Sequence, residues 1–136
     1  MSERGFAIVI VAHGGLAEQY LATLFHVIGK QERMVAVAIE DTDSREEKRV
    51  EIADLAANLN DGSGVVVVTD MFGGTPSNLA LRCLPNENYR ILYGVNMPSL
   101  VKLARSRGKD IDVALKLAVE AGHRYLNSCS EQPTGK

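Results

Sequence analysis

The sequence has few aromatic residues and no large excess of positive or negative charge. Both features argue against a general nucleic-acid binder. Only 5% of the residues are aromatic, tryptophan is absent, and the net charge is −2. No basic stripe with interleaved aromatic side chains occurs along the chain. Such a stripe is the usual footprint of a protein that contacts phosphates and bases.

Long apolar runs and cysteines are also few. The longest apolar run, Phe6–Ala12, is too short to cross a bilayer. Glu3 precedes this run where a secretory signal would carry positive charge. Cys83 and Cys129 stand alone, without the spacing of a metal site or a disulfide framework. Together these features predict a cytoplasmic location.

Apolar segments rich in β-branched residues recur along the chain. Its 136 residues, of which 46% are hydrophobic, suffice for one globular domain with its own core. Four segments have the length and composition of buried strands. They are Phe6–Ala12, Met34–Ile39, Val65–Thr69 and Tyr89–Tyr93.

Helical patterns separate these strands. The first helix should carry an apolar face from Leu16 to Ile28 and end at Gly29, because glycine commonly terminates a helix. The second should start at Ser44, since Glu47 three residues later completes a capping-box pattern. Both helices are long enough to cross from one strand to the next.

The helix after the third strand has a clear starting signal. Thr75 suits the N-cap and Pro76 the first helical position, and the helix should run to about Leu84, before Pro85. After the fourth strand, Pro98 should start a further short helix.

The C-terminal region is predicted less sharply. Asp110 can cap a last helix that reaches Ala121, with Gly122 as its stop. Tyr125–Cys129 fits either one more helical turn or a short edge strand. Residues 130–136 have the composition of a frayed, flexible tail.

Strands that alternate with single helices predict an α/β fold, with an open, mainly parallel sheet of four strands and helices on both faces. In the strand order 2-1-3-4, the first and third strands lie side by side, and ligands bind beyond their carboxyl ends. His13 follows the first strand and Asp70 the third. We therefore expect these two side chains to face each other.

A histidine beside a carboxylate can act as a nucleophile. If Asp70 accepts the Nδ1–H of His13, the ring tautomer is set and Nε2 keeps its lone pair. Gly73, Gly74 and Thr75 come directly after Asp70 and open a helix. Backbone N–H groups in such a turn bind phosphate oxygens, and the Thr75 hydroxyl can add a donor. This pattern predicts a transient phosphohistidine on His13.

The residues that other phosphate-binding sites require are missing from this sequence. The glycine loop has no P-loop lysine, and no G-x-G-x-x-G follows a strand. No second carboxylate accompanies Asp70, so a magnesium site is not expected. We expect neither metal nor cofactor, and a donor that brings its phosphoryl group on a protein side chain.

Plainer explanations remain open for each residue taken alone. His13 could be an ordinary loop residue, and Asp70 could simply cap its turn. His26 fits a surface or packing role, and His123 fits a helix C-terminus, where it complements the dipole. The charged stretch EDTDSREE fits a solvated loop and helix start.

Three segments resemble the enzyme IIA component of the mannose/fructose-type (mannose-class) phosphoenolpyruvate:sugar phosphotransferase system (PTS). They are IVIVAHGGLAEQYL, VTDMFGGTPSNLA and YGVNMPSLVKL, in the order and spacing of that family, and the similarity spans Phe6 to Gly122. The resemblance implies that His13 is the phosphorylated residue and Asp70 the group that orients it. It also places Thr75 where the family often has a phosphate-binding serine.

The resemblance also implies surroundings and partners. Met71 and Phe72 lie where the family carries apolar residues at the rim of the site. The phosphocarrier protein HPr would be the donor and a IIB-type protein the acceptor. Members are typically homodimers, and some exchange a C-terminal strand, which would fall at Tyr125–Cys129. Residues 1–129 would then form a single IIA domain.

Two alternatives to sugar transport remain. Because no IIB domain follows in this sequence, the phosphorylated and unmodified forms could instead be recognised by a regulatory partner. A receiver domain phosphorylated on Asp70 is the other alternative. It is disfavoured because Ala12-His13 stand where receivers keep an acidic pair.

Overall fold

The computed structural model describes residues 5–84, 86 and 88–130. Pro85, expected to stop a helix, lies outside the described residues, and so do residues 131–136 of the expected tail. Ser130, the first residue of that tail, is exposed and bent. None of the described helices is both long and apolar enough to span a membrane.

A four-stranded sheet forms the centre of the described chain, and all its neighbouring strands are parallel. Its order is β2-β1-β3-β4, as predicted. The strands are β1 (Ala7–His13), β2 (Met34–Ile39), β3 (Val65–Thr69) and β4 (Tyr89–Leu92).

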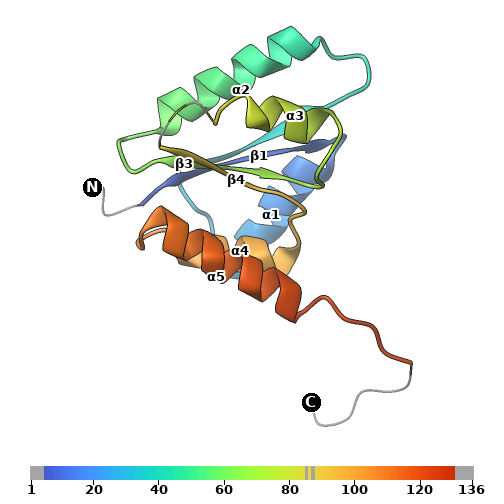
Figure 1. The fold of residues 1–136 in the computed structure, drawn as a ribbon, viewed down its shortest axis with the longest axis vertical. Helices are drawn as coiled ribbons and strands as arrows, with labels where there is room; N and C mark the ends of the chain where they lie inside the picture. The colour runs from blue at the N-terminus through green and yellow to red at the C-terminus, as the bar shows by residue number, and fades with distance from the viewer. Residues whose placement is uncertain (1–4, 85, 87, 131–136) are drawn as a thin grey trace.

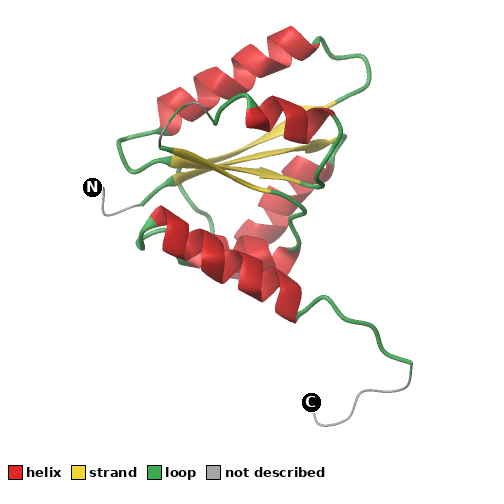
Figure 2. Cartoon of the chain, in the orientation of Figure 1, coloured by secondary structure: helices red, strands yellow, loops and turns green. Residues whose placement is uncertain are grey.

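Helices cover both faces of this sheet, so the molecule has three layers (Figures 1 and 2). Helices α2 (Arg45–Leu59) and α3 (Thr75–Leu81) lie on one face. Helices α1 (Leu16–Ile28), α4 (Met97–Arg105) and α5 (Ile111–Arg124) lie on the other. The predicted α/β fold with helices on both faces is confirmed.

The central strands are apolar on both sides because both sides are covered. In β1, Ile8 and Ile10 pack under α1, α4 and α5, whereas Val9 and Val11 pack under α2 and α3. Val11 pairs with Thr69, which brings the carboxyl ends of β1 and β3 together. The candidate site lies at this point.

Helix α3 differs from prediction at both ends. It begins at Thr75 with Gly74 as its N-cap, so the expected N-cap at Thr75 is off by one residue. It ends at Leu81 instead of Leu84, because the N–H groups from Arg82 to Leu84 bond to the carbonyls three residues earlier. This tighter pattern is common at helix ends.

Gly122 does not stop the last helix, contrary to prediction; α5 continues to Arg124. A Cβ on Gly122 would stand 3.1 Å from the Cβ of Ser99 and 3.2 Å from Oδ1 of Asn96. The glycine therefore serves the close approach of α5 to the start of α4. Its position near a helix end is incidental.

The segment after α5 forms neither of the two expected structures. Residues 126–129 have no regular secondary structure, and the chain leads away from the domain there (Figure 1). Tyr125 is 66% exposed and Leu126 is 76% exposed. Within the described chain, these apolar side chains lie outside the core.

Candidate active site

His13 and Asp70 meet at the carboxyl ends of β1 and β3. The Nδ1 atom of His13 lies 2.8 Å from Oδ2 of Asp70, and the backbone N–H of His13 donates to the same oxygen at 3.0 Å. The His13 side chain is 46% exposed and that of Asp70 only 8%. The carboxylate thus lies beneath the ring, and the ring faces solvent.

The Asp70 carboxylate is held in its ionised form. Burial raises its pKa, but the hydrogen bonds from the backbone and ring of His13 outweigh that effect and leave the pKa below its ordinary value. An ionised carboxylate only accepts hydrogen bonds, so the nitrogen facing it must carry a proton. In neutral His13 this leaves Nε2 with a free lone pair.

Gly74 leaves space beside that lone pair. A Cβ on Gly74 would lie 3.4 Å from Nε2 of His13 and 3.5 Å from Cε1. The residue has φ 86° and ψ 176°, a conformation that belongs almost only to glycine. The turn therefore brings backbone close to Nε2 without covering it.

The three predicted phosphate-binding residues are not equivalent. The N–H of Gly73 already donates to Oγ of Ser77 at 2.8 Å, so it is not free to bind an anion. Among the described residues, the N–H groups of Gly74 and Thr75 have no hydrogen-bond partner. Such unpaired donors at the start of a helix are suited to an anion.

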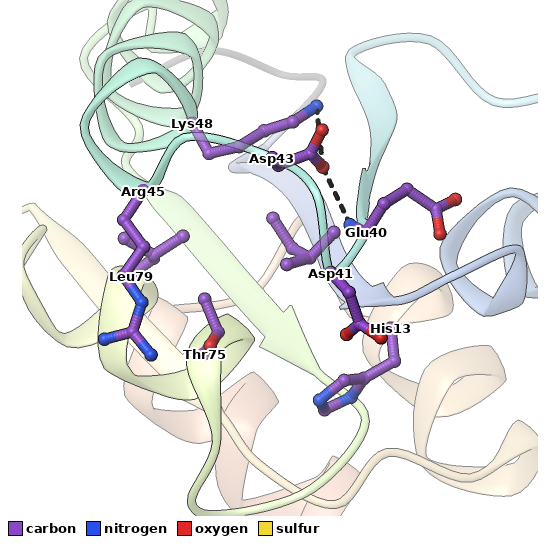
Figure 3. Close-up of a pocket in the computed structure, with 9 residues that line it drawn as sticks. His13, Glu40, Asp41, Asp43, Arg45, Lys48, Thr75 and Leu79 are labelled. Carbon is purple, nitrogen blue, oxygen red and sulfur yellow. Dashed lines mark hydrogen bonds and ion pairs between the residues drawn. The ribbon is translucent and has the colours of Figure 1, made fainter.

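A cavity of about 200 Å³ lies beside His13. His13 and Thr75 belong to its wall, as Figure 3 shows. The rest of the wall comes mainly from the segment between β2 and α2 and from the start of α2, with Glu40, Asp41 and Arg45 among its residues. From the sequence, His13 and Thr75 are expected at the site, whereas the charged stretch EDTDSREE is expected to be solvated.

The strand order itself indicates that the segment after β2 lies near His13. Because β2 lies beside β1, its carboxyl end must come close to His13. The register pairs His13 with Ile39, and the N–H of Gly14 donates to the carbonyl of Ile39 at 2.9 Å. The residues after Ile39 are therefore held next to the histidine.

Exposed apolar residues lie next to Asp70 in the chain. Met71 is 53% exposed and Phe72 is 71% exposed. The ring of Phe72 meets that of Tyr93 edge to face, with 4.9 Å between centroids. This contact orients an aromatic surface that a docking protein could cover.

The other two histidines take no part in the contact between His13 and Asp70. His26 is exposed in the last turn of α1, and His123 is exposed in the last turn of α5. Among the described residues, no cluster of three potential metal-binding side chains occurs.

A family model and a curated relative identify the family of this chain. The model of the family described as "PTS system fructose IIA component" matches residues 7–118. The mannose-specific EIIAB component of the PTS from Escherichia coli (strain K12) is 33% identical over 133 residues. That match covers 96% of this chain and 41% of the relative, so the chain spans less than half of the relative's length.

Solved structures show the same likeness. The PTS component EIIA from Streptococcus agalactiae has 25% identity and a TM-score of 0.81, with 90% of this chain and 96% of that chain covered. A PTS IIA protein associated with the fucose utilization operon of Streptococcus pneumoniae has 26% identity and a TM-score of 0.80, with 94% and 96% covered. These matches set aside the receiver alternative. The chain belongs to the fructose/mannose-type family of PTS IIA components.

Proposed function

We propose that His13 accepts a phosphoryl group on Nε2 and passes it to another protein. The contact that carries this proposal is the 2.8 Å approach of His13 Nδ1 to the buried Asp70 carboxylate. It leaves Nε2 as the nucleophile and sets a negative charge against the positive charge that develops on the ring.

The transfer exchanges one P–N bond for another. The lone pair of Nε2 attacks phosphorus while the bond from phosphorus to the donor's imidazole breaks. The donor ring, protonated on its other nitrogen, leaves as a neutral imidazole. His13 keeps its Nδ1 proton and becomes a phosphorylated imidazolium facing Asp70. The N–H groups of Gly74 and Thr75 and the Thr75 hydroxyl bind the phosphoryl oxygens.

Family membership supports the choice of partners. The donor is phosphorylated HPr and the acceptor is a IIB-type protein, in the cytoplasm. Both must bring a phosphorylatable side chain to the same Nε2 atom. The exposed Met71 and Phe72 supply apolar surface for this contact.

A reconstituted relay tests the proposal. The protein is incubated with ³²P-labelled phosphoenolpyruvate, enzyme I and HPr, and the label is tested for stability. Phosphohistidine survives alkali and is lost in acid. We expect such a label in the wild type and in the matched control His26→Ala, and none in His13→Ala. Undiminished label in His13→Ala would overturn the proposal.

We also propose that the protein works as a homodimer. Tyr125 and Leu126, which follow α5, are exposed, and beyond them the chain leads away from the domain (Figure 1). A groove of about 530 Å³ lies between β4 and α5, with Ile91 and Val119 in its wall. Light scattering should give a dimer for the wild type and a monomer for Leu126→Asp. A monomeric wild type at micromolar concentration contradicts this proposal.

A further inference from the structure

Arg45 brings a positive charge from a third element to the candidate site. It is the first residue of α2, and its side chain belongs to the wall of the cavity that His13 and Thr75 also line. In Figure 3 its guanidinium extends alongside Thr75, on the side of the cavity opposite His13. It also lines the adjoining groove with Thr75 and Arg82.

Two other cations of α2, Lys48 and Arg49, are already engaged in ion pairs. Lys48 lies 3.0 Å from Glu51 and 3.9 Å from Asp43, and it points toward Asp43 in Figure 3. Arg49 pairs with Glu46 one turn along the same helix. Within the described part of the chain, Arg45 forms no ion pair. Its guanidinium is therefore free to meet a ligand.

We propose that Arg45 is a further catalytic residue, which binds the phosphoryl oxygens while the group moves to and from Nε2 of His13. This inference rests on the proposed phosphorylation of His13. The guanidinium is a planar, permanently charged fork of donors that matches phosphate oxygens. The three oxygens stay on phosphorus throughout the transfer, so their charge must be balanced at each stage. Arg45 supplies that charge beside the neutral donors of Gly74 and Thr75.

Acidic residues of the same cavity limit what Arg45 can bind. Glu40, Asp41 and Asp43 also line the wall. Asp43 accepts the backbone N–H of Glu40 at 2.7 Å and faces Lys48. Glu40 and Asp41 are exposed and repel a free dianion. A phosphoryl group bound covalently to the donor or to His13 is kept in the cavity despite this repulsion, so the bound group is the ligand of Arg45 and free phosphate is not.

Single-turnover transfer from ³²P-labelled HPr tests the role of Arg45. Rates are measured over a range of HPr concentrations. This gives the maximal rate separately from the HPr concentration at half-saturation. The variants are Arg45→Gln, which removes the charge, and Arg45→Lys, which keeps it. Arg82→Gln is the matched control, because Arg82 is an exposed arginine of the adjoining groove that does not line the His13 cavity.

We expect Arg45→Gln to lower the maximal rate about 10- to 100-fold, as for loss of a hydrogen bond to a charged group. The HPr concentration at half-saturation should change less than about twofold. Arg45→Lys should recover part of the rate, and Arg82→Gln should match the wild type. A normal maximal rate in Arg45→Gln overturns the inference, and so does a change in half-saturation alone, which would make Arg45 a docking residue. A wild type that takes no label overturns the proposed function as well.

Discussion

The Asp70 carboxylate accepts both the backbone N–H and the ring N–H of His13, so its replacement alters the ring tautomer as well as a charge. In Asp70→Asn, the side-chain amide can donate to Nδ1 and move the proton to Nε2. We expect phosphorylation to slow on the order of 10²–10⁴-fold, as for a triad histidine in the wrong tautomer. Quench-flow labelling measures the rate, and circular dichroism checks the fold. A rate within about twofold of the wild type would contradict this role.

Acid should weaken the fold through the same contact. The pKa of Asp70 in the folded chain is below its ordinary value, because the hydrogen bonds from His13 outweigh the opposing effect of burial. A depressed folded pKa contributes stability that is present above the unfolded value of about 3.9 and is lost as the pH falls toward the folded pKa. Urea unfolding between neutral pH and pH 3 measures this loss. Asp70→Asn should show a smaller decrease in that range; an identical decrease contradicts the assignment.

Two adjacent glycines allow backbone strain to be separated from obstruction of the site. Gly73 and Gly74 both have positive φ, at 90° and 86°. A Cβ on Gly74 would lie 3.4 Å from Nε2 of His13, whereas a Cβ on Gly73 would meet nothing within 4 Å. Alanine at either position should cost about 1–3 kcal/mol of unfolding free energy.

Phosphorylation should respond differently to the two alanine substitutions. Gly74→Ala should slow it strongly, because the added methyl group crowds the attacking nitrogen, and Gly73→Ala should slow it much less. Denaturant titration and single-turnover labelling measure the two effects separately. Equal rates in both variants would mean that the space at Gly74 is not used.

At the scale of elements, Asn96 links α4 to α5. Its Oδ1 accepts the N–H of Ser99 at 3.0 Å and caps α4, while its Nδ2 donates to the carbonyl of Gly122 at 3.0 Å. Asn96→Ala removes both bonds and should lower the unfolding free energy by about 2–3 kcal/mol. Asn96→Ser keeps a capping oxygen and loses the donor to the Gly122 carbonyl without adding a charge, so its cost should be smaller. Equal costs in urea unfolding would contradict the role of the contact with Gly122.

Helix and strand patterns predicted the elements better than their ends. The bounds of β2 and β3 and the cap at Ser44 match, because apolar periodicity and capping are local signals. The prediction at Gly122 was wrong because a glycine is needed there for close contact with Ser99 and Asn96, which are far away in sequence. The segment Tyr125–Cys129 could not be assigned from its own residues, since within the described chain nothing packs it into the core.

At the scale of the whole molecule, the parallel topology makes the site. Strand order brings His13 beside Asp70, and both were predicted because each follows a strongly apolar strand. Which side chains complete the cavity could not be predicted the same way. Arg45 and Thr75 share its wall through the packing of α2 and α3 on one face of the sheet. No local pattern in the charged stretch EDTDSREE distinguishes Arg45 from its solvated neighbours.

The atom that carries phosphorus in the phosphorylated protein shows whether Nε2 of His13 is the nucleophile. The wild type is labelled with ¹⁵N in its histidines, phosphorylated through enzyme I and HPr, and examined by NMR for coupling between ³¹P and ¹⁵N. Because Nδ1 of His13 faces Asp70, we expect phosphorus on Nε2 of His13 and on no other residue. Phosphorus on Nδ1 of His13, on another histidine or on the Asp70 carboxylate would contradict it.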